Sequence, residues 1–202
     1  YEPSEGTVTL DGHLLNGKVP YKIASLGLGR TFQNIRLFKD LSVLDNVLIA
    51  FGNHHKAHVL ASFLRLPAYY KNEEELKAKA LELLKIFDLD KEAETLAKNL
   101  AYGQQRRLEI VRALATEPKI LFLDEPAAGM NPQETAELTA LIRRIKNEFN
   151  ITIMLIEHDM SLVMEVTERI YVLEYGRLIA HGTPDEIKND KRVIEAYLGG
   201  EA

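Results

Sequence analysis

Ile120-Leu121-Phe122-Leu123-Asp124-Glu125-Pro126 is the stretch of sequence that decides the fold. Its four apolar residues favour a strand buried on both faces, as in a parallel sheet. Asp124 and Glu125 follow at the carboxyl end of that strand, where open α/β sheets bind ligands. Because side chains alternate along a strand, we expect the two acids to point in different directions and to have different roles. Residues 151–156 are a second apolar run, and the helix expected at 132–149 completes a βαβ unit.

The rest of the chain predicts helices and hairpins around this unit. An alternating β-rich stretch before a turn pair predicts one arm of a hairpin, with its partner ahead of Tyr1. Proline, glycine and capping patterns place the later helix and hairpin boundaries. The expected elements are an arm at 7–10, a strand and loop at 26–38, a helix at 41–51, an insertion at 52–71 with a short helix stopped by Pro67, a helix capped by Asn72, a loop at 99–103, a helix ending before Pro118, a hairpin at 169–180 turning at Tyr175-Gly176, and a last helix behind Thr183-Pro184-Asp185-Glu186.

Composition excludes several classes of protein. The 202 residues are 46% hydrophobic and 27% charged, which is typical of one globular domain with a substantial core. The formal charge of -5 offers no overall attraction to nucleic acid. The chain has no cysteine, so disulfides and thiolate metal sites are excluded. Its apolar runs are too short for a membrane-spanning helix.

A second motif precedes the acidic strand. Leu100-Ala101-Tyr102-Gly103-Gln104-Gln105-Arg106-Arg107 opens a helix. Gly103 lets an anion approach the backbone, and the free N–H groups at a helix start favour phosphate. Asp124 suits a Mg²⁺ ion, which prefers oxygen ligands, and Glu125 suits a water that attacks a terminal phosphate. Together the two motifs predict phosphate chemistry.

In order and spacing, these motifs resemble the signature loop and Walker B strand of the ABC-transporter ATPase family. The resemblance covers nearly the whole chain. It implies an α/β fold: a P-loop NTPase (RecA-like) core with a parallel sheet, antiparallel β hairpins and an inserted α-helical subdomain. It divides a single domain, 1–202, into a core with the C-terminal helix at 1–40 and 117–202, and a helical signature subdomain at 41–116 with an insertion at 52–71.

The resemblance also implies the roles of individual residues, with ATP and Mg²⁺ as cofactors. Catalysis is assigned to Glu125, His158 and Gln33, and the Mg²⁺ ion to Asp124 and Gln33. The signature segment that binds nucleotide held by the opposite subunit is Ala101, Tyr102, Gly103 and Gln104. Asn131 falls in the D-loop at the dimer interface.

The sequence departs from the family pattern in three places. Ala101 replaces a serine, which removes one hydroxyl donor to phosphate, and Asn131 replaces an aspartate. The sequence also contains no G-x-x-x-x-G-K-[ST] loop, which cradles phosphates in the family. We therefore expect an N-terminally truncated domain without its Walker A segment. On its own, this truncated chain is expected to bind nucleotide poorly and to be inactive.

Further stretches resemble the LivG-type ATPase subunit of branched-chain amino-acid importers. They are RTFQNIRLF, NLAYGQQRRLEI, LDEPAAGMNP, LIEHDMSLVM and AYLGG. This implies a second, different ATPase chain in a head-to-tail dimer, transmembrane permease subunits, and an external solute-binding protein reached through the permease. It also implies a peripheral location on the cytoplasmic face of the inner membrane, with no nucleic acid as partner.

Other functions remain open at this point. ATPases for urea or amide uptake and for lipopolysaccharide export have similar sequences. A DNA-acting ATPase of the same superfamily is disfavoured, because the interval between Gln33 and Gly103 is too short for coiled-coil arms. A non-hydrolysing subunit would not need Glu125 or His158. His54, His55 and His58 lack the pattern of a metal site, and a solvated insertion is favoured there.

Overall fold

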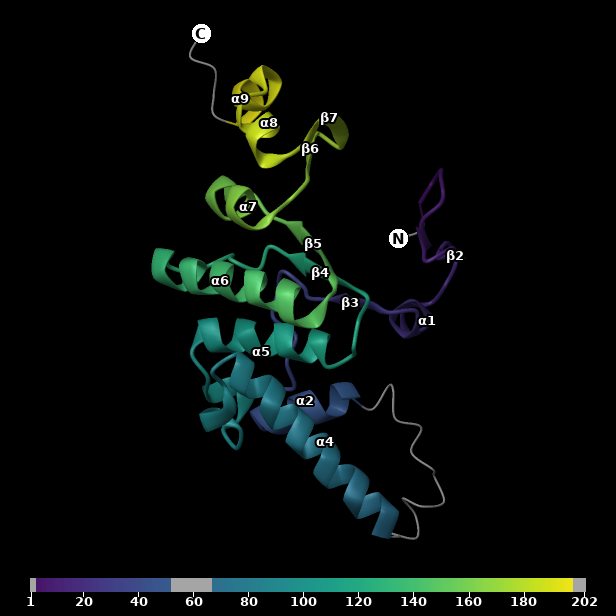
Figure 1. Ribbon diagram of the computed structural model, residues 1–202, viewed down its shortest axis with the longest axis vertical. Coiled ribbons are helices and arrows are strands. Elements are labelled where there is room, and N and C mark those ends of the chain that lie inside the picture. The colour runs from purple at the N-terminus through teal and green to yellow at the C-terminus, as the bar shows by residue number, and fades with distance from the viewer. Residues whose placement is uncertain (1–2, 52–66, 198–202) are drawn as a thin grey trace.

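The computed structural model describes residues 3–51 and 67–197, and its centre is a parallel sheet (Figure 1). Strands β3 (Leu28–Arg30), β4 (Ile120–Asp124) and β5 (Thr152–Ile156) lie in the order β3-β4-β5. Helix α6 (Pro132–Phe149) connects β4 to β5, so the expected βαβ unit is confirmed. Leu121 and Leu123 are fully buried, as the apolar run predicted. The expected burial on both faces is wrong, because Ile120 and Phe122 are only partly buried and Met154 and Ile156 of β5 are exposed.

The N-terminal hairpin differs from the prediction in its partner. Strand β1 (Thr9–Leu10) pairs with β2 (His13–Leu14), which follows it in the chain rather than preceding it. Asp11 and Gly12 both have positive φ, at 47° and 76°, as a two-residue type I′ turn requires. The expectation of an arm paired ahead of Tyr1 was therefore wrong, because this turn brings the chain straight back. Helix α1 (Pro20–Ser25), which the sequence analysis did not predict, leads to β3.

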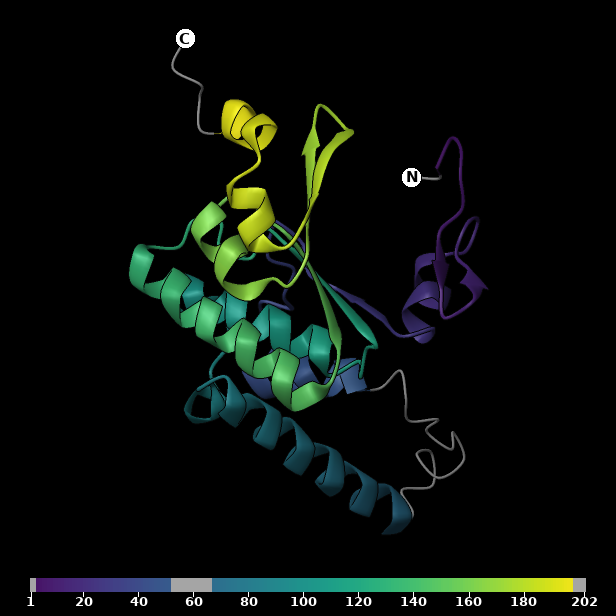
Figure 2. The same cartoon turned by 45° about the horizontal axis from the view of Figure 1, so that its top comes forward.

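Helices α2 (Val43–Phe51), α4 (Pro67–Ile86) and α5 (Tyr102–Leu114) pack together on one side of the molecule (Figure 2). They share one core with the sheet and α6, to which Val47, Leu84, Leu108, Leu121 and Leu138 belong. Two short 3₁₀ turns, Asp90–Glu92 and Ala97–Asn99, join α4 to α5.

Two helix starts differ from the prediction. Helix α4 begins at Pro67 rather than behind Asn72, because proline is tolerated in a first turn whose N–H groups have no partner within the helix. The insertion expected at 52–71, and the helix within it, fall largely outside the described residues. Tyr102 and Gly103 lie in the first turn of α5, and not in a loop, since Ala101 already occupies the N-cap position.

The C-terminal part forms a smaller unit with its own apolar cluster. It contains α7 (Met160–Val166), β6 (Ile170–Glu174), β7 (Arg177–Gly182), α8 (Pro184–Lys188) and α9 (Lys191–Tyr197). Strands β6 and β7 turn at Tyr175 and Gly176, as predicted. Thr183 and Glu186 form the expected capping box, because each side chain accepts the other's backbone N–H.

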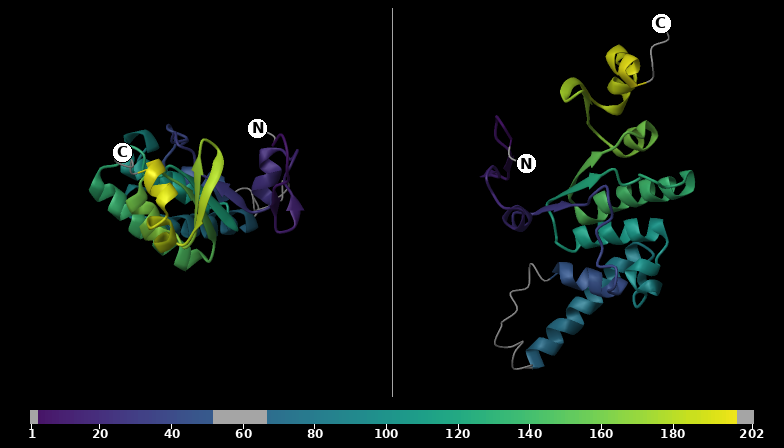
Figure 3. Two further views of the ribbon diagram at one scale, coloured as in Figure 1. Left: turned by 90° about the horizontal axis from the view of Figure 1, so that it is seen from above. Right: turned by 180° about the vertical axis from the view of Figure 1, so that it is seen from behind.

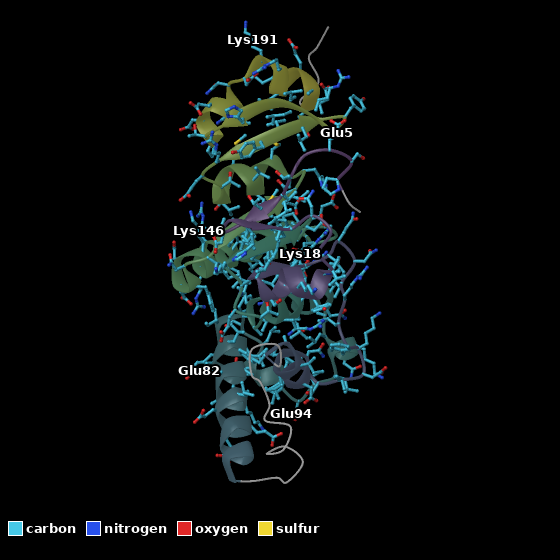
Figure 4. All side chains as sticks on the ribbon, turned by 90° about the vertical axis from the view of Figure 1, so that its right-hand side faces the viewer. Glu5, Lys18, Glu82, Glu94, Lys146 and Lys191 are labelled. Atoms are coloured by element: carbon cyan, nitrogen blue, oxygen red, sulfur yellow. The ribbon has the colours of Figure 1, made fainter. Side chains whose placement is uncertain are left out.

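The arrangement is elongated. Seen from behind, α8 and α9 lie at one end, α4 lies at the other, and the N-terminal hairpin stands to one side (Figure 3). Charged side chains such as Lys191, Lys146 and Glu82 lie on the outside along this whole length (Figure 4). No helix among the described residues is both long and apolar enough to cross a bilayer.

Candidate active site

Glu125 and Gln33 meet at the carboxyl end of the sheet. Glu125 follows the last residue of β4, has a φ of 44°, and donates its backbone N–H to the carbonyl of Ile156 at 2.9 Å. Gln33 lies in the loop after β3, and its Nε2 donates to Oε2 of Glu125 at 2.6 Å. Since Gln33 donates through nitrogen, its amide oxygen remains available as a ligand or acceptor.

Asp124 has a different set of partners. Its Oδ2 accepts a hydrogen bond from Nη2 of Arg30 at 2.8 Å, and its backbone N–H donates to Oγ1 of the buried Thr31 at 3.3 Å. Arg30 also lies over the ring of Phe32, with 5.2 Å from Cζ to the ring centroid. The two adjacent carboxylates therefore bind separate groups, as alternation along the strand predicts.

His158, in the loop after β5, lies close to Glu125, the partner of Gln33. Its Nδ1 lies 3.9 Å from Oε1 of Glu125 and 3.8 Å from Oε2 of Glu157. The His158 side chain is 73% exposed, so it can turn toward a ligand. Glu157 is buried and accepts the backbone N–H of Ala127 at 2.9 Å, which fixes the loop after β4. The ends of three neighbouring strands thus bring Gln33, Glu125 and His158 together.

The signature segment lies beside the loop that precedes α6. The hydroxyl of Tyr102 donates to the carbonyl of Ala128 at 2.9 Å. Gly103 is close to α6, because a Cβ there would be 3.0 Å from Oε1 of Glu134. Gln104 accepts the backbone N–H of Ala101 at 3.1 Å, which is half of a capping box, since alanine has no acceptor to return.

Asn131 is the N-cap of α6. Its Oδ1 accepts the backbone N–H of Glu134 at 3.0 Å, and Glu134 accepts that of Asn131 at the same distance. Among the described residues, no hydrogen bond joins the signature segment or Asn131 to the side chains of Gln33 or Glu125. The structure therefore presents two groups of residues: the three strand ends, and the α5 start with the loop before α6.

Two functional candidates were missed by the sequence analysis. Arg106 and Glu109 form an ion pair on α5 with side chains 0% and 5% exposed. In the sequence they are part of a charged helical stretch, which is typical of a solvated face. Their spacing of three residues was a signal of pairing, but it gave no sign of burial.

The strand ends offer suitable ligands for a small hard cation. No group of three or more metal-ligating side chains occurs in the described part of the chain. Mg²⁺ characteristically takes one or two protein oxygens together with substrate phosphates. The carboxylate of Asp124 and the free amide oxygen of Gln33 fit that requirement, although Arg30 holds one carboxylate oxygen.

Solved structures with the same fold identify the class of protein. An ATP-binding cassette of an ABC transporter, in its ADP conformation, has a TM-score of 0.80 and 30% identity over 98% of this chain and 79% of its own. A dimeric ATP-binding cassette bound to ADP and Pi has a TM-score of 0.74 and 25% identity over 91% of this chain and 75% of its own. The fold and the site together define an ATP-binding cassette with a P-loop NTPase fold.

Sequence comparison gives the family. A family described as "ABC transporter" matches residues 1–128, and one described as "Branched-chain amino acid ATP-binding cassette transporter" matches 177–202. The branched-chain amino acid transport ATP-binding proteins BraF of Pseudomonas aeruginosa and LivG of Escherichia coli are each 46% identical over 98% of this chain and 78% of their own length. The chain belongs to the ABC transporter family of ATP-binding proteins.

Proposed function

We propose that this chain is the ATP-hydrolysing subunit of an importer for branched-chain amino acids. The observation that carries hydrolysis is the 2.6 Å contact between Gln33 and Glu125, with His158 beside it at the ends of three adjacent strands. The names of BraF and LivG, together with the family match at 177–202, support branched-chain amino acids as the substrate.

Each strand end has one chemical task in this proposal. Glu125 orients the attacking water and accepts its proton, since a carboxylate beside the terminal phosphate is placed for general base catalysis. Gln33 holds that carboxylate through its amide nitrogen. His158 contacts the γ-phosphate from the third strand end. Asp124 and the amide oxygen of Gln33 hold Mg²⁺, which supplies charge neutralisation on the phosphates when it is bound.

The signature segment acts on nucleotide held by a second ATPase subunit. Backbone N–H groups at the start of α5 and the glycine at 103 suit an anion arriving from outside the chain. The dimeric state of a related cassette bound to ADP and Pi supports this arrangement. Closure and reopening of that dimer would move the transmembrane permease subunits. An external solute-binding protein would deliver the solute to this permease. The second ATPase is a different chain, and the assembly lies on the cytoplasmic face of the inner membrane.

The division of the chain is part of the same proposal. Residues 1–40 and 117–202 form the core with the C-terminal helix, and residues 41–116 form the signature subdomain. That subdomain includes α2, α4 and α5, which pack against one another and against the core. Such packing suits a lobe that passes movement between the nucleotide and the permease.

A transport assay tests the proposal. The subunit expressed from its gene is reconstituted in liposomes with its permease, partner ATPase and solute-binding protein. We expect MgATP-dependent uptake of labelled leucine, isoleucine or valine, and no uptake when EDTA removes Mg²⁺. ATP-dependent uptake of urea or an amide, without uptake of leucine, would contradict branched-chain amino acids as the substrate and assign urea or an amide instead. Absence of ATP hydrolysis in the complete assembly would contradict the enzymatic role.

A further inference from the structure

A buried ion pair lies on α5, about one turn beyond the signature segment. Nη1 of Arg106 is 3.0 Å from Oε2 of Glu109, and both side chains are almost completely enclosed. Burying charges is costly unless they are paired and their remaining hydrogen-bonding groups find partners. The other hydrogen bonds of this pair therefore show what it holds in place.

Those hydrogen bonds go to the backbone of the active site. Arg106 donates to the carbonyls of Phe32 at 2.7 Å and Gln33 at 2.8 Å, and its Nη2 also reaches the carbonyl of Glu125 at 3.5 Å. Oε1 of Glu109 accepts the backbone N–H of Phe32 at 3.4 Å and of Arg36 at 3.1 Å. The pair thus forms hydrogen bonds with the backbone on both sides of the Gln33 side chain, from Phe32 to Arg36, and reaches the backbone of Glu125.

The loop has no regular secondary structure that would fix Gln33 by itself. A catalytic side chain is only as well placed as the backbone and supporting groups behind it. Arginine suits this support because its planar fork donates to several acceptors in fixed directions, whereas lysine offers a single flexible ammonium group.

We infer that Arg106, held by Glu109, is a positioning residue that sets the distance between Gln33 and Glu125. It also connects α5, whose start bears the signature segment, to both of these residues. A displacement of α5 would shift the Gln33 carbonyl and hence its side chain. The inference rests on the proposed function for Gln33 and Glu125, because it assigns Arg106 a role through them rather than through contact with substrate.

Conservative variants in the assembled transporter test this role. Arg106→Lys keeps the charge and loses the fork, whereas Glu109→Gln keeps an acceptor and loses the charge. We expect each to lower kcat by about 10- to 100-fold, with KM for ATP within about twofold, as misplaced catalytic groups do. Arg177→Lys is the matched control, because Arg177 is an exposed arginine of β7 that belongs neither to the α5 motif nor to the loop of Gln33. Its kcat should equal that of the wild type.

A double-mutant cycle with Gln33→Ala separates positioning from general destabilisation. If Arg106 acts through Gln33, then Arg106→Lys lowers kcat much less in the Gln33→Ala background than alone. Glu109→Gln should behave in the same way, so the test survives a variant that fails to fold. Amide exchange at Phe32 and Arg36 should also quicken in Glu109→Gln, because their backbone N–H groups donate to Glu109, and it should quicken more there than at amides outside this loop.

The outcomes distinguish this inference from the proposed function. Additive losses of kcat, or wild-type kcat in both conservative variants, would overturn the role of Arg106 and leave that of Gln33 standing. A fully active Gln33→Ala variant would instead overturn the role proposed for Gln33, and the inference about Arg106 would be overturned with it.

Discussion

Nε2 of Gln33 donates a 2.6 Å hydrogen bond to Oε2 of Glu125, although 92 positions separate the two residues in the chain. The register of the sheet explains this contact. Arg30 pairs with Phe122 on the neighbouring parallel strand, and Gln33 and Glu125 follow these two partners by the same number of residues. The site is therefore a product of strand pairing.

Glu125→Gln tests whether this carboxylate accepts the proton of the attacking water. The amide has the same shape but is not a base, so we expect hydrolysis to fall by about 10²- to 10⁴-fold. ATP-bound dimers should accumulate, which size-exclusion chromatography with ATP can measure beside phosphate release. Glu94→Gln, an exposed change on another loop, serves as control. Unchanged turnover in Glu125→Gln would remove Glu125 from this role.

His158→Ala tests the third strand end. The side chain is 73% exposed, so its loss should change the free energy of unfolding by less than about 0.5 kcal/mol. We expect kcat to fall far more than affinity for ATP, because His158 is assigned to the γ-phosphate during hydrolysis. Turnover and nucleotide titrations measure the two effects, with His13→Ala as control. Equal losses of binding and turnover would argue against this assignment.

Asn131 offers a test of a structural role at a position expected to face a partner. Its side chain caps α6 through the N–H of Glu134, so Asn131→Ala should lower the free energy of unfolding by about 1 kcal/mol. Asn131→Asp retains the acceptor and places a negative charge at a helix start, where it is favourable. Denaturant unfolding should therefore show the loss in the alanine variant alone. A comparable loss in Asn131→Asp would mean that the cap is not the reason.

The cap of α8 should respond to acid. The backbone N–H of Thr183 holds the pKa of the Glu186 carboxylate below its ordinary value of 4.5. Because the folded state has the lower pKa, this stabilisation is complete above the ordinary value and is lost as pH falls through the lowered one. NMR titration of the Thr183 amide should follow this loss, and Glu186→Gln should abolish it. An identical titration in both proteins would contradict the prediction.

The central part of the fold could be predicted because its signals are local. The short apolar runs at 120–123 and 151–156 correctly indicated strands, although each strand packs only one face against the core, and Tyr175-Gly176 has the chemistry of a tight turn. The partner of β1 was misplaced because a short arm does not specify the direction of its pairing. The start of α4 was misplaced because Pro67 permits a helix to begin as well as to end.

The candidate site was predictable only in part, because only some of its residues have a local signal in the sequence. Glu125 stands out at the end of an apolar strand, whereas the assignments of Gln33 and His158 came from a family pattern. Arg106 and Glu109 could not be found, because burial depends on the loop that folds over them and not on their own neighbours. A charged pair at helical spacing has the same sequence pattern whether it is solvated or enclosed.

The left-handed backbone of Glu125, at a φ of 44°, places the stability of the fold in conflict with the rate of ATP hydrolysis. An L residue in this conformation costs about 1–2 kcal/mol relative to glycine. A glycine at this position would relax the turn and remove the carboxylate, giving a sturdier chain without its proposed base. Directed evolution that rewards heat resistance alone would therefore tend to discard this residue, and only selection for transport would retain it.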